Sequence, residues 1–245
     1  MIHPTALVDR KAELDSSVRV GAYSVIGPGV QIAARTVIDA HVVLEGPSQF
    51  GEDNRIHSFA CLGGAPQDKK YADEPTTLVV GDGNVIRESC TFNRGTAQDR
   101  GTTTIGDRNW IMAYVHIAHD CDLGNDAILA NNATLAGHVQ VGDFAILGGF
   151  TKVHQFCRIG AHSFSAMDSG LSRDLPPYVM AAGHLAEPRG LNTEGLKRRG
   201  FSRDALRSIR EAYRTLYRSD LKLAEAIKAL QAQVAASAVA KEAVA

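Results

Sequence analysis

The sequence predicts a mainly β protein in which parallel strands coil into a triangular solenoid, followed by a small helical domain. Three observations predict this fold: an aliphatic residue at every sixth position, a small residue four positions after it, and the end of both patterns near residue 175. A period of six fits neither the 3.6-residue turn of a helix nor the alternation of an ordinary strand. We therefore divide the chain into a solenoid, residues 1–175, and a C-terminal helical domain, residues 176–245.

The aliphatic column begins at Ile2 and falls on every sixth residue as far as Leu62. It restarts at Val80 and at Ile105, and from there it runs to Leu171 with one polar member. Three hexads would close one coil of about 18 residues, and successive coils would stack at about 4.8 Å, the spacing of paired strands. The aliphatic side chains then fill the interior of the prism.

The column of small residues includes three of the four cysteines, Cys90, Cys121 and Cys157. No two cysteines have CxxC spacing, so we expect reduced structural thiols. The residue directly after the aliphatic one is often glycine, as at Gly27, Gly51, Gly81, Gly106, Gly124, Gly142 and Gly160. Glycine at this place predicts a turn that needs a positive φ.

Two segments, 63–78 and 93–104, interrupt the repeat without ending it. In a solenoid such insertions form external loops, which often carry function. The alternative is that they are surface insertions without a function. Pro176 and Pro177 are expected to end the regular coils. Beyond them, Ser202 is expected to cap a helix that runs to Tyr217.

A second amphipathic helix is expected from Leu221 to Val234, and the alanine-rich end after Ala235 is expected to fray.

The formal net charge is only -1, and acidic and basic residues are mixed along most of the chain. This charge distribution favours neither nucleic acid nor a membrane surface as a partner. The sequence shows no secretory signal and no apolar run of the roughly 18 residues that a membrane span needs. We expect a soluble, cytoplasmic protein.

Two histidines and an acid lie close together at His116, His119 and Asp120. His119 is two residues beyond the buried Ile117 and should point outwards, with Asp120 beside it to hold its tautomer, which makes His119 a candidate general base. An inert surface histidine is the alternative. Further histidines, His138 and His154, follow about one and two coils later, and three clustered imidazoles also leave zinc open as a reading.

Arginines recur every three or four residues along the first C-terminal helix, at Arg203, Arg207, Arg210, Arg214 and Arg218. A solvated face is the ordinary reading of such a stripe. Few acids interleave it, so a dock for an acidic helical partner or for phosphates is equally compatible with the pattern.

Five segments together resemble one family of enzymes: residues 67–71, 116–121, 130–138, 153–156 and 192–201. They are similar to the UDP-N-acetylglucosamine O-acyltransferases of lipid A synthesis, which are hexapeptide-repeat acyltransferases. The resemblance covers nearly the whole chain and implies a left-handed parallel β-helix that works as a homotrimer. It also implies that acyl carrier protein donates a 3-hydroxyacyl group to the glucosamine 3-hydroxyl, without a cofactor or a metal.

The same resemblance assigns roles to individual residues. It implies that His119 is the catalytic base, that Asp120 orients it, and that the backbone N–H of Gly137 helps to stabilise the oxyanion. It also implies a substrate-binding set: Asp68, Lys70, His116, His138, His154, Gln155, Met167, Asn192, Glu194, Arg198 and Arg199. Within this set, Asp68 and Lys70 would reach the site of a neighbouring subunit, and the last four would bind the nucleotide, arginine being suited to a diphosphate. The arginine stripe becomes the expected dock of the carrier protein.

Two positions depart from the family pattern. Asn93 stands where the family often has histidine, so an acceptor with a 3-amino group in place of the 3-hydroxyl stays open. Met167 stands at the end of the acyl groove, where members that prefer longer chains have glycine, and it predicts 3-hydroxydecanoyl as the preferred acyl group.

Four other readings compete with this one. The related enzyme that N-acylates a UDP-glucosamine derivative carries an additional N-terminal domain, whereas here the hexads begin at Ile2. A γ-type carbonic anhydrase would bind stoichiometric zinc. Acetyl-coenzyme A acetyltransferases share the fold but lack the segment 192–201, and a non-catalytic scaffold would not need motifs that converge on one cleft.

Overall fold

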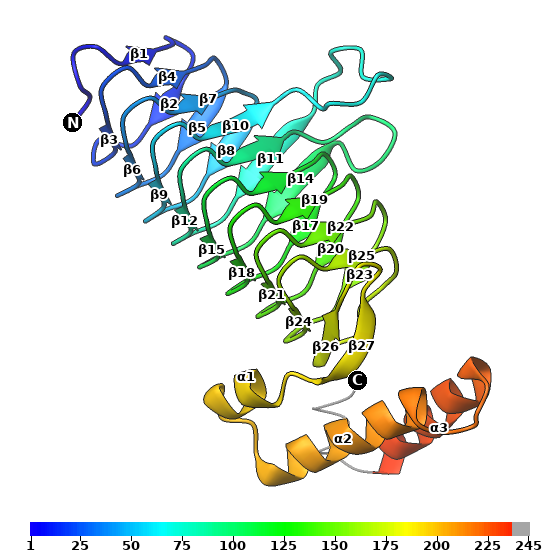
Figure 1. The fold of residues 1–245 in the computed structure, drawn as a ribbon. Helices are drawn as coiled ribbons and strands as arrows, with labels where there is room; N and C mark the ends of the chain where they lie inside the picture. Colours follow the sequence, from blue (N-terminus) through cyan, green and yellow to red (C-terminus); the bar gives the residue numbers. More distant parts are fainter. Residues whose placement is uncertain (237–245) are drawn as a thin grey trace.

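The computed structural model describes residues 1–236, which form a triangular prism of stacked coils with helices at one end (Figure 1). Sheet B has the strands β1 (Leu7–Val8), β4 (Val25–Ile26), β7 (Val43–Leu44), β10 (Cys61–Gly64), β13 (Thr91–Asn93), β16 (His116–Ile117), β19 (Thr134–Leu135), β22 (Lys152–Val153) and β25 (Gly170–Leu171). Sheet C has β2 (Glu13–Leu14), β5 (Val30–Ile32), β8 (Ser48–Phe50), β11 (Thr77–Val80), β14 (Thr102–Ile105), β17 (Asp122–Leu123), β20 (Gln140–Val141) and β23 (Arg158–Ile159). Sheet A has β3 (Arg19–Val20), β6 (Val37–Ile38), β9 (Arg55–Ile56), β12 (Val85–Ile86), β15 (Trp110–Ile111), β18 (Ile128–Leu129), β21 (Ile146–Leu147), β24 (Phe164–Ser165), β26 (Val179–Ala182) and β27 (Glu187–Leu191).

The three sheets are the faces of a left-handed parallel β-helix, which confirms the predicted fold class. Each strand from β1 to β26 pairs in parallel with a strand one coil away, as β16 does with β13 and β19. The chain turns three times in each coil, and we call the three corners the A–B, B–C and C–A edges after the sheets that they join. These edges position every candidate site residue of the solenoid.

The predicted aliphatic column forms the core. Ile86, Ile117, Leu135 and Leu147 are fully buried, and Cys90 and Cys121 are buried in the column of small residues. Burying one such aliphatic side chain contributes about 1.5–3 kcal/mol, and the prism repeats this in every hexad. The repeat therefore stabilises each coil against its neighbours.

The prediction that the glycines after the aliphatic residues have positive φ was wrong. Positive φ occurs two residues later, in non-glycine residues such as Asp120 (φ 59) and His138 (φ 64). The glycines are needed for packing instead. A Cβ on Gly106 would lie 2.6 Å from the carbonyl oxygen of Gly124, and one on Gly160 would lie 2.3 Å from the nitrogen of Pro177, so the next coil leaves no room for a side chain.

Both interruptions of the repeat are external loops, and both leave the prism at the B–C edge. Strands β10 and β13 reach Gly64 and Asn93, and the following strands begin at Thr77 and Thr102, so residues 65–76 and 94–101 form the loops proper. Figure 1 shows them projecting on the same side of the body. We call them the first and the second loop.

The sheet continues beyond residue 175, where the sequence predicted only helices. Strand β26 adds in parallel to β24, and β27 returns antiparallel to β26. Val179 and Ala181 are buried against the last coil, so the prism is closed by a hairpin. The proline pair interrupts the hexads without ending the sheet.

Three helices follow: α1 (Thr193–Arg198), α2 (Arg203–Tyr217) and α3 (Leu223–Ala236). Ser202 caps α2 as predicted, since its side chain accepts from the N–H of Ala205 at 3.1 Å. The sequence did not predict α1, and it placed the start of α3 two residues early. The expected fraying after Ala235 concerns residues 237–245, which lie outside the described residues, while Ala236 is still helical.

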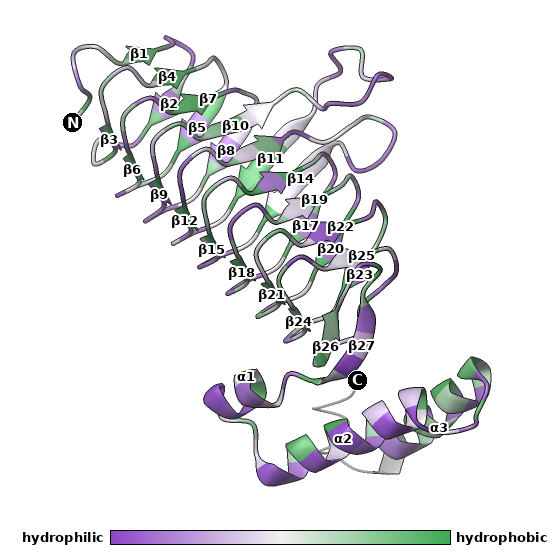
Figure 2. Cartoon of the chain, viewed as in Figure 1, coloured by the Kyte–Doolittle hydropathy of each residue, from purple (hydrophilic) through white to green (hydrophobic). Residues whose placement is uncertain are grey.

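Helix α2 is amphipathic: Leu206 and Ile209 are buried, and most of its remaining surface is hydrophilic (Figure 2). Among residues 1–236, no helix combines the length and the apolar character that crossing a membrane requires.

Candidate active site

His119 lies at the B–C edge, between β16 and β17. The second loop leaves the same edge one coil earlier, between β13 and β14. Gly137 occupies the equivalent corner position one coil later, because 18 residues separate the two. The stacking of coils therefore brings His119 against Gly137 and places Asp120 against His138.

His119 and Asp120 form a hydrogen-bonded pair, with 2.8 Å between His119 Nδ1 and Asp120 Oδ2. The Asp120 side chain is fully buried, while that of His119 is 15% exposed. The N–H and hydroxyl of Thr96 also donate to the Asp120 carboxylate, at 2.9 and 2.6 Å. An ionised carboxylate only accepts hydrogen bonds, so this contact places a proton on Nδ1 of His119, and in the neutral imidazole Nε2 is then the nitrogen with the lone pair.

Gly137 provides the space into which the His119 ring fits. A Cβ at this position would lie 2.6 Å from Cε1 and 2.8 Å from Nε2 of His119. The N–H of Gly137 donates to no acceptor among residues 1–236. A free backbone donor next to a basic nitrogen is an arrangement that can stabilise a developing oxyanion.

His138 completes the cluster at this corner. Its ring contacts His119 edge-on, with centroids 5.0 Å apart, and stacks on Phe156 at 4.4 Å. Asp99, on the second loop, lies 2.6 Å from His138 Nδ1. Neither Asp99 nor Thr96 was predicted from the sequence; the only signal was that the second loop interrupts the repeat next to the histidine segment.

The remaining predicted histidines lie around this cluster. His116 is on β16, with its Nδ1 2.8 Å from the Thr91 hydroxyl, and burial lowers the pKa of its imidazole. His154 and Gln155 are exposed on the next coil, and Nδ1 of His154 is 3.1 Å from the Gln155 carbonyl oxygen. Phe156 occupies the position of His138 one coil later and stacks on its ring. His154, two residues earlier in the chain, therefore lies beside this stack of corner side chains and is not part of it.

The first loop carries Asp68 and Lys70, which contact each other and not the histidine cluster. The Asp68 carboxylate accepts from the N–H of Lys70 at 3.0 Å, and Lys70 is exposed. Asn93, the departure from the family pattern, is buried and holds the base of this loop through a 2.9 Å bond from its Nδ2 to the Ala65 carbonyl.

The predicted nucleotide residues lie at the C–A edge instead. Asn192 caps α1, since its Oδ1 accepts from the N–H of Gly195 and its Nδ2 donates to the His162 carbonyl. Glu194 is paired with Lys197 at 2.9 Å, and Arg198 is exposed. These four residues share one short helix and its ends.

Arg199 packs on a column of stacked aromatic rings at the same edge. Its Nη2 donates to the Phe144 carbonyl at 3.0 Å, and its guanidinium carbon lies 5.3 Å from the Phe144 ring centre. Phe144, His162 and Tyr178 stack on successive coils, and Phe201 contacts the last two edge-on. The column fixes the direction of Arg199.

His162 should make stability depend on pH. Burial, with the nearby Arg199 charge, lowers the pKa of His162 from 6.5 to about 4. The unfolded state therefore binds more protons between these values, so stability is complete above about pH 6.5 and is lost as the pH falls towards 4. Because the ring is only half-buried, we expect a loss of about 1–2 kcal/mol.

Urea denaturation at about pH 5 and about pH 7.5, with His162→Phe as the matched variant, measures this loss. The variant keeps the aromatic stack and removes the titrating group, so its stability should fall less than that of the wild type over the same interval. Equal falls in the two proteins would contradict the role of His162.

Met167 lies at the third corner, the A–B edge, between β24 and β25, and is 75% exposed. The predicted site residues therefore occupy all three edges: His119 and its neighbours at B–C, Arg199 and its neighbours at C–A, and Met167 at A–B. One copy of the chain brings together the catalytic set and the predicted substrate-binding residues of the B–C edge, His138 among them, but not those of the other two edges.

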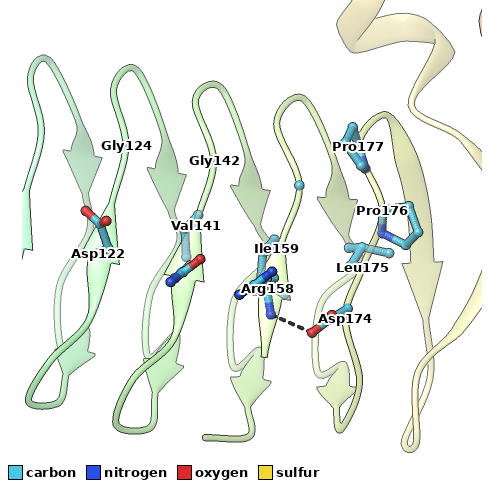
Figure 3. A pocket seen from close by; sticks show the side chains of 12 residues that line it. Asp122, Gly124, Val141, Gly142, Arg158, Ile159, Asp174, Leu175, Pro176 and Pro177 are labelled. Atoms are coloured by element: carbon cyan, nitrogen blue, oxygen red, sulfur yellow. Dashed lines mark hydrogen bonds between the residues drawn. The ribbon is translucent and has the colours of Figure 1, made fainter. Parts of the chain in front are cut away.

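A hollow of about 540 Å³ lies on the outer face of sheet C, where Asp122 and Arg158 project from the strands (Figure 3). Its floor consists of strand and corner backbone that ends at Pro176 and Pro177. A second hollow of about 680 Å³ lies over the first coils of the same face. Hollows that recur along one flat face reflect the strand surface, so we do not assign the chemistry to either.

The cluster also contains atoms of the type that bind metals. His119, Asp120 and His138 place one such atom each within 4.8 Å of one another. These atoms already take part in hydrogen bonds, since Asp120 accepts from Thr96 and His119 while His138 pairs with Asp99. The donor set fits an imidazole–carboxylate network better than a metal centre.

Comparisons with known proteins identify the family of the chain. Residues 174–245 match the family described as UDP N-acetylglucosamine O-acyltransferase, domain 2, and residues 102–137 match bacterial transferase hexapeptide repeats. The chain is 59% identical over 233 residues to an acyl-(acyl-carrier-protein)–UDP-N-acetylglucosamine O-acyltransferase of Herminiimonas arsenicoxydans, covering 95% of this chain and 89% of that protein. Its counterpart from Janthinobacterium is 60% identical with the same coverage.

Solved structures give the same result. UDP-N-acetylglucosamine acyltransferase of Francisella novicida superposes with a TM-score of 0.96 at 40% identity, covering 98% of this chain and 88% of that one. The O-acyltransferase of Moraxella catarrhalis gives 0.94 at 46% identity, covering 96% and 92%. The chain therefore belongs to the UDP-N-acetylglucosamine O-acyltransferase family.

Proposed function

We propose that the chain transfers an (R)-3-hydroxyacyl group from acyl carrier protein to the glucosamine 3-hydroxyl of UDP-N-acetylglucosamine, the first step of lipid A biosynthesis. One observation carries the chemistry: the Nδ1 of His119 is bonded to a buried carboxylate, while within residues 1–236 its Nε2 has no partner and neither has the N–H of the adjoining Gly137. Family membership supports the choice of substrates. The cytoplasmic location expected from the sequence is part of the same proposal.

In the proposed mechanism, Nε2 of His119 takes the proton of the 3-hydroxyl as its oxygen attacks the thioester carbonyl. Asp120 holds the reactive tautomer and stabilises the imidazolium that forms. The N–H of Gly137 donates to the oxyanion of the tetrahedral intermediate. When the intermediate collapses, the C–S bond breaks and His119 returns the proton to the departing thiolate, which regenerates the base.

Substrate binding is proposed to need a homotrimer. His116, His138, His154 and Gln155 lie at or beside the B–C edge with His119, and the loop that carries Asp68 and Lys70 leaves the same edge. The other residues that would bind the substrates, Met167 and the four around α1, lie at the A–B and C–A edges, so a single copy does not bring the whole set to His119. Packing three copies side by side would let the C–A or A–B edge of one copy meet the B–C edge of the next. Asp68, Lys70, His116, His138, His154 and Gln155 would then line the sugar and acyl site, with Asn192, Glu194, Arg198 and Arg199 at the nucleotide.

The arginines of α2 are proposed to dock the carrier protein. Arg203, Arg207, Arg210, Arg214 and Arg218 are all exposed. Within α2, Asp204 is paired with Arg207 at 3.3 Å, which leaves most of the stripe for an acidic partner.

We expect Met167 to limit acyl length. Its exposed side chain would lie in the groove at a subunit boundary and block the end of a long chain. Each methylene that cannot be buried forfeits about 0.8 kcal/mol, so the four methylenes between decanoyl and myristoyl amount to about 3 kcal/mol, or more than hundredfold. Met167→Gly should raise the rate with 3-hydroxymyristoyl relative to 3-hydroxydecanoyl at least about tenfold. An unchanged ratio would refute the assignment, and a general loss of activity cannot mimic the shift.

A transfer assay tests the whole proposal. The protein is incubated with UDP-N-acetylglucosamine and a series of 3-hydroxyacyl carrier proteins, and product is measured for each chain length. Product that is greatest with 3-hydroxydecanoyl, and that survives chelation, supports the proposal. Transfer only to the 3-amino sugar would correct the acceptor, and activity that is lost on chelation and restored by zinc would favour the metal reading instead.

A further inference from the structure

The second loop folds back onto the catalytic corner and is fixed there at several points. Thr96 donates twice to Asp120, as described above. Arg100 forms a 3.0 Å ion pair with Asp122, and its guanidinium also lies 3.3 Å from the Cys121 carbonyl oxygen. The segment between Thr96 and Arg100 is therefore held against the cluster, and Asp99 lies in it.

Asp99 contacts the second histidine of the cluster as Asp120 contacts the first. The distance from Asp99 Oδ2 to His138 Nδ1 is 2.6 Å, whereas Asp120 Oδ2 is 3.9 Å from the same nitrogen. A bond this short to a carboxylate requires a proton on Nδ1. Two imidazole–carboxylate pairs thus lie side by side, and the loop supplies the second acid.

The aromatic neighbour of His138 fixes the plane of its ring. It does not fix which edge of the ring faces the loop. Phe156 stacks on the ring with planes 10° apart. A half-turn of the ring within that stack would exchange Nδ1 with Cδ2 and Nε2 with Cε1, and stacking alone does not oppose it. The hydrogen bond to Asp99 does, because only one of the two orientations places an N–H against the carboxylate.

We propose that Asp99 is a positioning residue for acyl transfer: it holds His138 with Nδ1 protonated and bonded, so that Nε2 is the nitrogen presented to substrate beside His119. Nε2 of His138 has no partner within the described part of the chain. The proposal rests on the proposed function, in which His138 contacts the substrate. It adds the acid that orients this histidine.

Steady-state kinetics test it. Asp99→Ala should lower kcat/KM by about 10-fold to 100-fold, the range of one hydrogen bond to a charged group, and Asp99→Asn should lose less because its amide oxygen still accepts. In a His138→Ala background, Asp99→Ala should cause no further loss, since it acts only through that ring. Losses that multiply in the double variant would overturn the proposal.

Asp122→Asn is the matched control, because it removes the carboxylate that pairs with Arg100 in the same loop and leaves Asp99 in place. If Asp99 acted only by fixing the loop, this control would reproduce its effect. We expect a change of less than about threefold, consistent with an exposed ion pair.

The ¹⁵N resonances of the His138 ring give a readout that needs no activity. The wild type should show protonated Nδ1, and Asp99→Ala should show a mixture of tautomers. An unchanged tautomer in the variant would refute the positioning role. A wild type that transfers no acyl group would refute the proposed function, while the resonances would still test the contact, so the two failures are distinguishable.

Discussion

Replacing His119 with alanine is expected to lower kcat by about 10²–10⁴-fold, the usual contribution of a general base. The His119 side chain combines an Nδ1 bonded to a fully buried carboxylate with an Nε2 that has no partner within residues 1–236, and it packs against Gly137, whose N–H is also unpaired there. Without it, the sugar hydroxyl must lose its proton to water. The decrease is measured under saturating donor and acceptor, so that binding does not contribute.

UDP-N-acetylglucosamine should bind His119→Ala about as tightly as it binds the wild type, because the residues proposed to bind the nucleotide lie at the C–A edge and do not contact His119. Calorimetric titration provides this control. Asp120→Asn should also be severe, and the double variant should be little worse than His119→Ala, because the pair acts as one unit. A variant without His119 that keeps more than about a tenth of the wild-type kcat would rule out this residue as the base.

Gly137→Ala is the second change for which we expect a large effect. The added methyl carbon would lie 2.6–2.8 Å from Cε1 and Nε2 of His119, well inside van der Waals contact, so the imidazole must move. A displacement of about 1 Å from the reacting geometry costs about 10²-fold in rate. The same transfer assay measures it, with kcat expected to fall more than KM rises.

Gly149→Ala is the control for the effect of glycine replacement as such. Gly149 occupies the same position in its hexad, two residues after a buried aliphatic one, but at the A–B edge. There the new methyl carbon would lie 3.4 Å or more from its neighbours. Met167 Cγ, at 4.0 Å from the new methyl carbon, is in ordinary van der Waals contact, so this variant should fold like the wild type and keep its kcat with the 3-hydroxydecanoyl donor. If both alanine variants lost activity equally, the loss at Gly137 would come from the coil and not from His119.

The two residues of the second loop explain why the corner is more than an exposed histidine. Thr96 saturates the buried carboxylate of Asp120, and Asp99 pairs with His138. A fully buried carboxylate without these donors would be costly. The loop that interrupts the repeat therefore completes the polar network, which supports a functional reading of the insertion over decoration.

The sequence by itself determined the fold, the buried column and the cap of α2. An aliphatic side chain at every sixth residue can be buried only if the chain turns at every sixth residue, so Ile117 and Leu135 define the coil locally. The cap at Ser202 is also local, since it involves residues three apart. The pair of His119 and Asp120 was visible because the two are adjacent in the chain.

Only the tertiary structure decided which distant residues meet. Asp99 and His138 are 39 residues apart, in segments with no shared period, so no pattern linked them. The glycines after the aliphatic residues serve close packing of coils and not positive φ, a difference that depends on the neighbouring coil. The assignment of Met167, His119 and Arg199 to three different edges likewise follows from how many residues each coil uses and where the chain turns. Such contacts depend on the stacking of the whole prism, because proximity between coils is a property of the assembled fold and not of any one segment.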